Sequence, residues 1–199
     1  MATIPHIRRK IVQYAHWWYG NFRSQLGRPI RWPRNEGAVL VYHGLTAGPP
    51  RRINARFIDL ARFESDLRYI AEHLHPVSLS DYAQGIRHPE RFTVAISFDD
   101  GYQNNLLALP LLEEYQIPAT FFITASQSKG HDLLWNDLLD LVQATGPQHL
   151  TLMGQPFARH PKKGYLNRQG IGLRQSLEAA SDAEFLEAIE ALRASSDFQ

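Results

Sequence analysis

Short apolar runs alternate with amphipathic stretches along the first two thirds of the chain. The runs are rich in β-branched and aromatic residues, which favour buried strands. They occupy residues 38–42, 92–98 and 119–124. Because segments of helical spacing separate these runs, the pattern predicts parallel βα units.

The segments between the strands predict helices. One of them carries an apolar stripe at helical spacing, which Pro76 ends. The stripe consists of Phe63, Leu67, Ile70 and Leu74. We expect a short strand at residues 77–79, then a small helix capped by Ser80 and Asp81. A further helix is expected through residues 106–115.

The pattern changes after residue 130, where helices and one hairpin replace the βα alternation. Residues 149–160 predict a hairpin around Gly154 and Gln155. Ser181 and Glu184 form a capping box before the last amphipathic helix. Three parts follow from these patterns: a basic amphipathic segment (1–36), a βα part (37–130) and an insertion-like part of helices and a hairpin (131–199).

Composition narrows the class of protein. The chain has 199 residues, of which 44% are hydrophobic and 21% are charged, as is ordinary for a soluble globular protein. Its length is below the roughly 250 residues of a closed eight-unit barrel. It contains no cysteine, so a metal must be held by His, Asp or Glu side chains.

The N-terminal segment is basic, with seven Arg or Lys and no acidic residue in residues 1–35. Ile7, Ile11 and Trp18 recur at helical spacing. Two interpretations stay open: a peripheral helix at a membrane interface, or a surface helix packed on the body or on a partner. The segment lacks the features of a secretory signal, and no apolar run is long enough to span a membrane. The default localisation is therefore the cytoplasm.

Two adjacent carboxylates follow the strongest predicted strand. Asp99 and Asp100 come directly after residues 92–98, and Gly101 follows them. Ligands of parallel α/β folds bind at the carboxyl ends of strands, where both side chains can turn toward one cavity. One carboxylate can bind a divalent metal while the other accepts a proton from water. The competing interpretation is an Asp pair that only caps the next helix.

The flanking residues favour the first interpretation. The stretch Val-Ala-Ile-Ser-Phe-Asp-Asp-Gly at 94–101, followed by Pro-Ala-Thr-Phe-Phe at 118–122, resembles the NodB-homology polysaccharide deacetylases, the family-four carbohydrate esterases. Val-Tyr-His-Gly at 41–44 resembles an early Tyr-His segment of many members. Trp135-Asn136-Asp137 resembles the Trp-x-Asp segment of members with a long insertion. The resemblance implies an α/β fold, a partial (β/α) barrel with parallel strands.

The resemblance also implies a metal-dependent hydrolase that removes acetyl groups from a glycan. Asp99 corresponds to the general base and Asp100 to the ligand of a divalent metal, zinc or a similar ion. His43, Tyr42 and Gly101 are expected to line the site. The implied partner is an acetylated saccharide, and no nucleic-acid motif accompanies the basic residues. The glycan, the choice between N- and O-acetyl groups, the metal and the oligomeric state all stay open.

The family completes its metal site with two closely spaced histidines after the Ala-Thr-Phe-Phe strand. We find no such pair in this sequence, where the nine histidines are separated differently. The chain therefore resembles the N-terminal part of a deacetylase domain, and we expect little or no activity from it alone. The alternatives are a saccharide-binding or scaffolding pseudoenzyme and, from the strand-terminal Asp, an aspartate-nucleophile phosphatase. The latter normally needs Asp-x-Asp.

Overall fold

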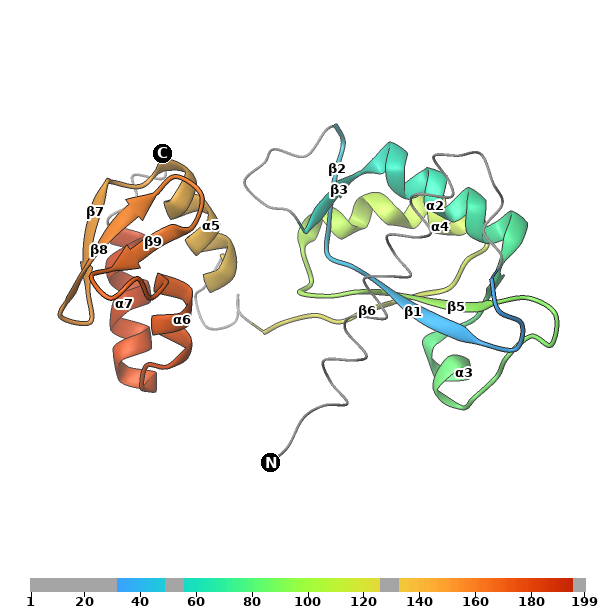
Figure 1. Cartoon of the computed structure of the whole chain (residues 1–199). Coiled ribbons are helices and arrows are strands. Elements are labelled where there is room, and N and C mark those ends of the chain that lie inside the picture. The colour runs from blue at the N-terminus through green and yellow to red at the C-terminus, as the bar shows by residue number, and fades with distance from the viewer. Residues whose placement is uncertain (1–31, 49–55, 126–132, 195–199) are drawn as a thin grey trace, which may run out of the picture.

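The computed structural model describes residues 32–48, 56–125 and 133–194. The expected amphipathic helix in residues 1–31 lies outside this described part. The chain forms two units, each with its own hydrophobic core (Figure 1). The first core draws on residues between Leu45 and Ile117, and the second on residues between Leu138 and Leu192.

The first unit is built on a parallel sheet with β5 (Thr93–Phe98) at its centre. One side of β5 pairs along its full length with β1 (Gly37–Tyr42). The other side is shared by β4 (His75–Pro76) at its start and β6 (Ala119–Phe121) at its end. All six residues of β5 are buried, as expected of a central strand covered on both faces.

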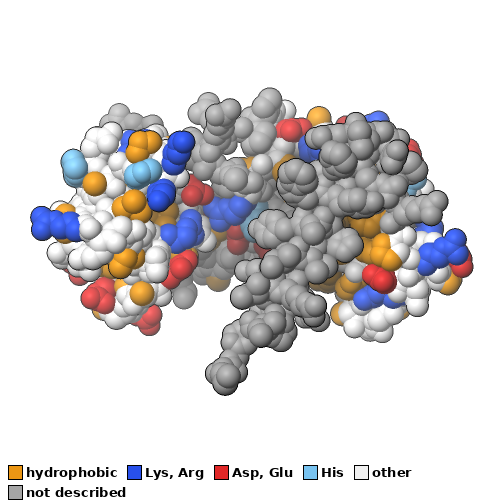
Figure 2. Space-filling view, viewed as in Figure 1, with side chains coloured by type: hydrophobic (Ala, Val, Ile, Leu, Met, Phe, Trp, Pro, Cys, Tyr) orange, Lys and Arg blue, Asp and Glu red, His pale blue; other side chains and the backbone are white. Residues whose placement is uncertain are grey.

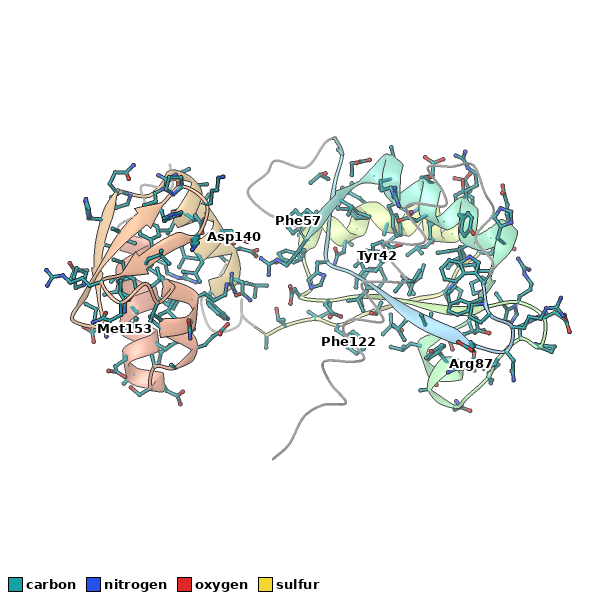
Figure 3. The ribbon with its side chains drawn as sticks, in the orientation of Figure 1. Tyr42, Phe57, Arg87, Phe122, Asp140 and Met153 are labelled. Carbon is teal, nitrogen blue, oxygen red and sulfur yellow. The ribbon has the colours of Figure 1, made fainter. Side chains whose placement is uncertain are left out.

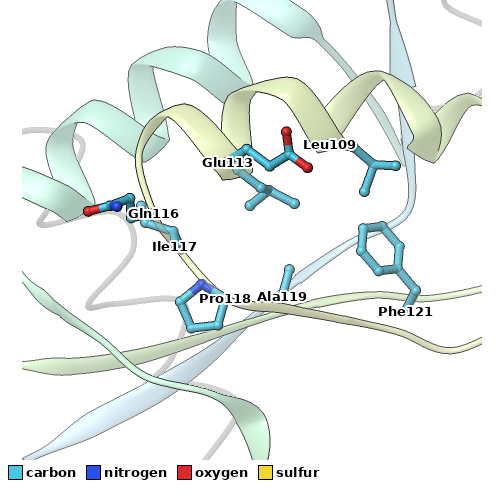
Figure 4. A pocket seen from close by; sticks show the side chains of 8 residues that line it. Leu109, Glu113, Gln116, Ile117, Pro118, Ala119 and Phe121 are labelled. Carbon is cyan, nitrogen blue, oxygen red and sulfur yellow. The ribbon is translucent and has the colours of Figure 1, made fainter.

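Helices cover the sheet on both faces (Figure 1). Helix α2 (Leu60–His73) and helix α4 (Leu109–Glu114) lie over one face, and α3 (Leu79–Ala83) lies on the other. The predicted stripe of α2 is confirmed, because its buried residues are Phe63, Leu67 and Ile70. An open apolar hollow of about 400 Å³ lies between α4 and β6 (Figure 4). None of the candidate site residues lines it.

Several predicted boundaries in this unit are wrong. The strand expected at 77–79 is instead β4, and α3 begins earlier than expected because Ser78 caps it. The helix expected at 106–115 is a 3₁₀ helix, η1 (Gln103–Ala108), followed by α4. Pro110 explains the division, since it has no N–H to donate to the carbonyl of residue 106. Two short parallel strands, β2 (Gly44–Thr46) and β3 (Phe57–Asp59), were not predicted.

The second unit packs three helices against a three-stranded antiparallel sheet. Its core is lined mainly by leucines. In chain order the elements are α5 (Trp135–Thr145), β7 (His149–Leu152), β8 (Gln155–His160), β9 (Gly164–Asn167), α6 (Leu173–Glu178) and α7 (Asp182–Ala194). The predicted capping box is confirmed: Ser181 and Glu184 exchange hydrogen bonds at the start of α7.

The predicted hairpin forms from β7 and β8, but its turn is one residue earlier than expected. Met153 and Gly154 are the two central residues, with φ of 52° and 67°. Two positive φ values define a type I′ turn, whose twist matches that of the flanking strands. The third strand, β9, extends the hairpin and was not predicted.

The predicted open, incomplete parallel sheet is confirmed. In the described part of the chain, β1, β4, β5 and β6 form an open four-stranded sheet, β2 and β3 form a separate parallel pair, and there is no closed barrel. On β1, the side chain of Val41 is 51% exposed. Within the described residues, no helix is both long and apolar enough to cross a membrane.

The cap of α3 supplies a stability test. Ser78→Ala removes the side-chain oxygen that accepts the Asp81 N–H at 3.0 Å, and we expect a loss of about 1 kcal/mol in unfolding free energy. Ser80, the cap expected from the sequence, is the matched control, because its exposed hydroxyl accepts only from the Gln84 side chain. Urea denaturation measures both variants. Equal losses for Ser78→Ala and Ser80→Ala would contradict this assignment of the cap.

Candidate functional site

Strand β5 places Asp99 and Asp100 at its carboxyl end. Alternate residues of the strand, Val94, Ile96 and Phe98, enter the core. The backbone N–H of Asp99 then donates to the carbonyl of Tyr42 at 2.9 Å, which extends the ladder between β1 and β5 by one bond. The strand pairing therefore ends at the carboxylate pair.

The turn after β5 is tightly constrained. Asp100 and Gly101 both have left-handed backbone conformations, with φ of 72° and 67°. Asp tolerates this region better than most residues, and Gly adopts it freely. A Cβ on Gly101 would lie 3.1 Å from the Cα of Ile123. The Thr124 hydroxyl donates to the carbonyl of Asp100 at 3.0 Å. The segment after β6 therefore holds the turn from one side.

His43 lies beside this turn. It follows β1 directly, and the register that pairs Tyr42 with Phe98 brings the ends of both strands to the same level. Its Nε2 is 3.9 Å from Oδ2 of Asp100, and the two side chains are 29% and 26% exposed. The structure thus brings His43 together with Asp100 at a partly accessible position, where both can meet a ligand.

Tyr42 lies in a different environment from His43. Its ring stacks on Phe98 at 5.5 Å and meets Phe63 edge-on at 5.1 Å. Tyr42 lies between β1 and α2 (Figure 3), and its hydroxyl donates to Asp66 of α2 at 3.3 Å. Burial, with the Asp66 carboxylate, raises the pKa of Tyr42 well above its usual value. This hydroxyl therefore remains protonated and ties β1 to α2.

The described residues do not form a complete metal centre. Among them, no three His, Asp or Glu side chains are grouped closely enough to hold one ion. His43 and Asp100 are a pair, whereas catalytic zinc sites use three protein ligands and a water. His131, which the sequence places between the two units, lies outside the described residues. The site as described fits part of a zinc site only.

A second group of polar side chains begins at Tyr102, directly after the carboxylate turn, and was not predicted as a group from the sequence. Tyr102 follows Gly101, Arg56 precedes β3, and Asp137 and Asp140 belong to the second unit. Acidic and basic side chains gather between the two units (Figure 2). Asp140 lies on the side of the second unit that faces the first, and Phe57 lies on the side of the first unit that faces the second (Figure 3). The only sequence signal for this group was the Trp-x-Asp segment that ends at Asp137.

Zinc titration tests the partial site. Four-ligand sites bind zinc with about 10–16 kcal/mol, so two ligands are expected to give a Kd no tighter than about 1 µM. His43→Ala removes one of them, and we expect the remaining affinity to fall at least about tenfold. His149→Ala, an exposed histidine of β7, is the control and is expected to change nothing. Isothermal titration calorimetry measures these affinities. Nanomolar binding would contradict the two-ligand description.

Comparison with known proteins confirms the resemblance seen in the sequence. Residues 87–162 match the family model described as polysaccharide deacetylase. YxkH of Bacillus subtilis (strain 168), a protein named as a polysaccharide deacetylase, is 30% identical over 98 residues. That match covers 47% of this chain and 33% of YxkH, so the chain spans about a third of that relative's length.

Solved structures give partial similarities. The deacetylase PplD of Streptococcus pyogenes is 19% identical, with a TM-score of 0.42, over 54% of this chain and 52% of its own length. IcaB from Ammonifex degensii is 26% identical, with a TM-score of 0.41, over 54% of this chain and 48% of its own length. The chain spans about half the length of either protein.

Proposed function

We propose, because residues 87–162 match the polysaccharide deacetylase family model, that this chain takes an acetylated saccharide as its substrate. The observation that carries the proposal is the placement of Asp99 and Asp100 at the carboxyl end of the central strand, with His43 beside them. Ligand sites of parallel α/β sheets occupy this end. The reaction is hydrolysis of an N- or O-acetyl group.

Asp99 supplies the general base in this proposal. Its carboxylate accepts a proton from water as the water oxygen attacks the acetyl carbonyl. When the carbon–nitrogen or carbon–oxygen bond of the tetrahedral intermediate breaks, the same carboxyl returns the proton to the departing amine or alcohol. The products are acetate and the deacetylated saccharide. Asp100 and His43 form the polar wall beside the reacting group.

The proposal includes low activity for this chain. By resemblance Asp100 would hold a divalent metal, but the described residues supply no complete set of ligands, so no step is assigned to a metal. Removal of a single oxyanion-stabilising donor costs an enzyme about 10²–10³ in rate. We therefore expect a site that binds acetyl groups and hydrolyses them slowly or not at all.

Saccharide binding tests the substrate class. Addition of an acetylated chitooligosaccharide to the ¹⁵N-labelled chain is expected to shift the backbone amide signals of Asp100 and Gly101. The fully deacetylated oligomer of the same length is the matched control and is expected to leave both signals in place, because it lacks the acetyl carbonyl. No response to the acetylated oligomer, or equal responses to the two, would contradict the proposed function.

Acetate release tests the activity. With the acetylated chitooligosaccharide and added zinc or cobalt, we expect little or no turnover from the 199-residue chain. Rapid turnover that Asp99→Asn abolishes would contradict low activity while supporting Asp99 as the base. Saccharide binding with no hydrolysis under any metal would favour the alternative function, a non-catalytic saccharide-binding module. The observation that supports this alternative is that His43 and Asp100 provide two candidate metal ligands, fewer than the three of a catalytic zinc site.

A further inference from the structure

A polar contact joins the second unit to the carboxylate turn. The hydroxyl of Tyr102 donates to Oδ2 of Asp137 at 2.7 Å, across 35 residues of sequence. Tyr102 is the residue after Gly101, and Asp137 lies in the first turn of α5. The start of α5 therefore rests on the turn that presents Asp99 and Asp100.

Arg56 adds a second link to the same carboxylate. Its Nη2 pairs with Oδ1 of Asp137 and lies 3.5 Å from Oδ2 of Asp140. Asp137 thus uses one oxygen for the Tyr102 hydroxyl and the other for a guanidinium. Its side chain is only 13% exposed. Charge-assisted hydrogen bonds shielded in this way are stronger than neutral or fully exposed ones.

The ring of Tyr102 is held independently of its hydroxyl. It meets the ring of Phe57 edge-on at 4.9 Å. Phe57 in turn packs against Gly44, where a Cβ would lie 2.3 Å from the ring. The contact with Phe57 therefore fixes the ring, and the hydrogen bond to Asp137 fixes the direction of its hydroxyl.

The turn after β5 depends on contacts on both of its sides. A left-handed conformation at a residue other than Gly costs about 1–3 kcal/mol, so the conformation of Asp100 depends on the contacts around the turn. Thr124 holds the carbonyl of Asp100 on one side. We propose that Asp137 is a positioning residue that holds the other side through Tyr102, so that the second unit sets the geometry of the carboxylate pair. This inference rests on the proposed function, in which Asp99 and Asp100 form the reacting site.

Paired alanine substitutions on one helix test the proposal. Asp137→Ala removes the acceptor of Tyr102, whereas Asp140→Ala removes an equal charge three residues later with no contact to Tyr102. In ¹⁵N spectra of the full 199-residue chain, we expect Asp137→Ala to shift the Gly101 amide. The Asn105 amide, which donates to the Tyr102 carbonyl, should exchange with solvent about tenfold faster. Asp140→Ala should leave both amides unchanged.

Tyr102→Phe tests the same bond from its other end and keeps the aromatic contact with Phe57. We expect it to reproduce the Gly101 shift of Asp137→Ala, and the double variant to add nothing further. An unchanged Gly101 signal in Tyr102→Phe, or equal shifts from Asp137→Ala and Asp140→Ala, would overturn the inference. These readouts need no substrate, so they can fail while saccharide binding by the unaltered chain succeeds. If Asp137→Ala moves Gly101, acetylated chitooligosaccharide should also bind more weakly to that variant than to Asp140→Ala, and equal binding would overturn the inference.

Discussion

Phe98→Ala is expected to destabilise the first unit by about 3–5 kcal/mol, because it empties the centre of that unit's core. Phe98 is fully buried. Its ring stacks on Phe121 at 4.8 Å and contacts Tyr42 and Phe63 within 5.6 Å. The ring therefore joins β1, α2 and β6 to the strand that carries the carboxylates. A loss of this size is a large part of the stability of an ordinary domain.

The two separate cores make this effect local. In Phe98→Ala, the amides of β5 should lose protection from hydrogen exchange while those of α5 keep theirs. Phe157→Ala is the matched control, since Phe157 is equally buried in the second core, and it should give the opposite pattern. Native-state hydrogen exchange read by NMR distinguishes the two. Loss of protection in both units from either variant would contradict independent cores.

The elements that were predicted correctly are those whose own residues decide them. Strand β5 is rich in β-branched and aromatic residues, and its pattern predicts a buried strand without any knowledge of its partners. Helix α2 has a regular apolar stripe and a proline after its end. Strands β2 and β3 could not be predicted in this way. Each has three residues, and they form because they pair with each other across a segment of loop composition.

The site residues also differ in how far the sequence alone could predict their positions. Asp99, Asp100 and His43 follow predictable strands, so their place at one edge of the sheet was accessible from the sequence. Tyr42 was expected to line the site, but its ring packs on the core face of β1, two residues from Leu40, as strand alternation explains. The contacts of Asp137 could not be predicted, because its partners lie 35 and 81 residues away. Only the packing of the two units brings them together.

Gly101→Ala is expected to destabilise the first unit by about 2–3 kcal/mol and to abolish the proposed binding of acetylated saccharide. Two costs add. An alanine at φ of +67° loses about 1–2 kcal/mol relative to glycine. Its Cβ would also lie 3.1 Å from the backbone of Ile123, closer than ordinary van der Waals contact. Relief of that contact must move either the segment after β6 or the turn, and each displaces Asp100 from His43.

Gly154→Ala separates these two costs. Gly154 has the same φ of +67°, at the tip of the β7–β8 hairpin, but an added Cβ there meets nothing within 4 Å. We expect it to lose only the conformational part, about 1–2 kcal/mol, and to leave saccharide binding intact. Urea denaturation and the oligosaccharide titration measure both variants. Equal losses of stability would mean that the close approach of Ile123 carries no cost. Intact binding in Gly101→Ala would mean that the turn does not position the carboxylates. Gly101 and Gly154 have the same φ, so the difference between the two alanine variants isolates the contact with the segment after β6. It measures how far that contact, rather than backbone conformation alone, shapes the candidate site.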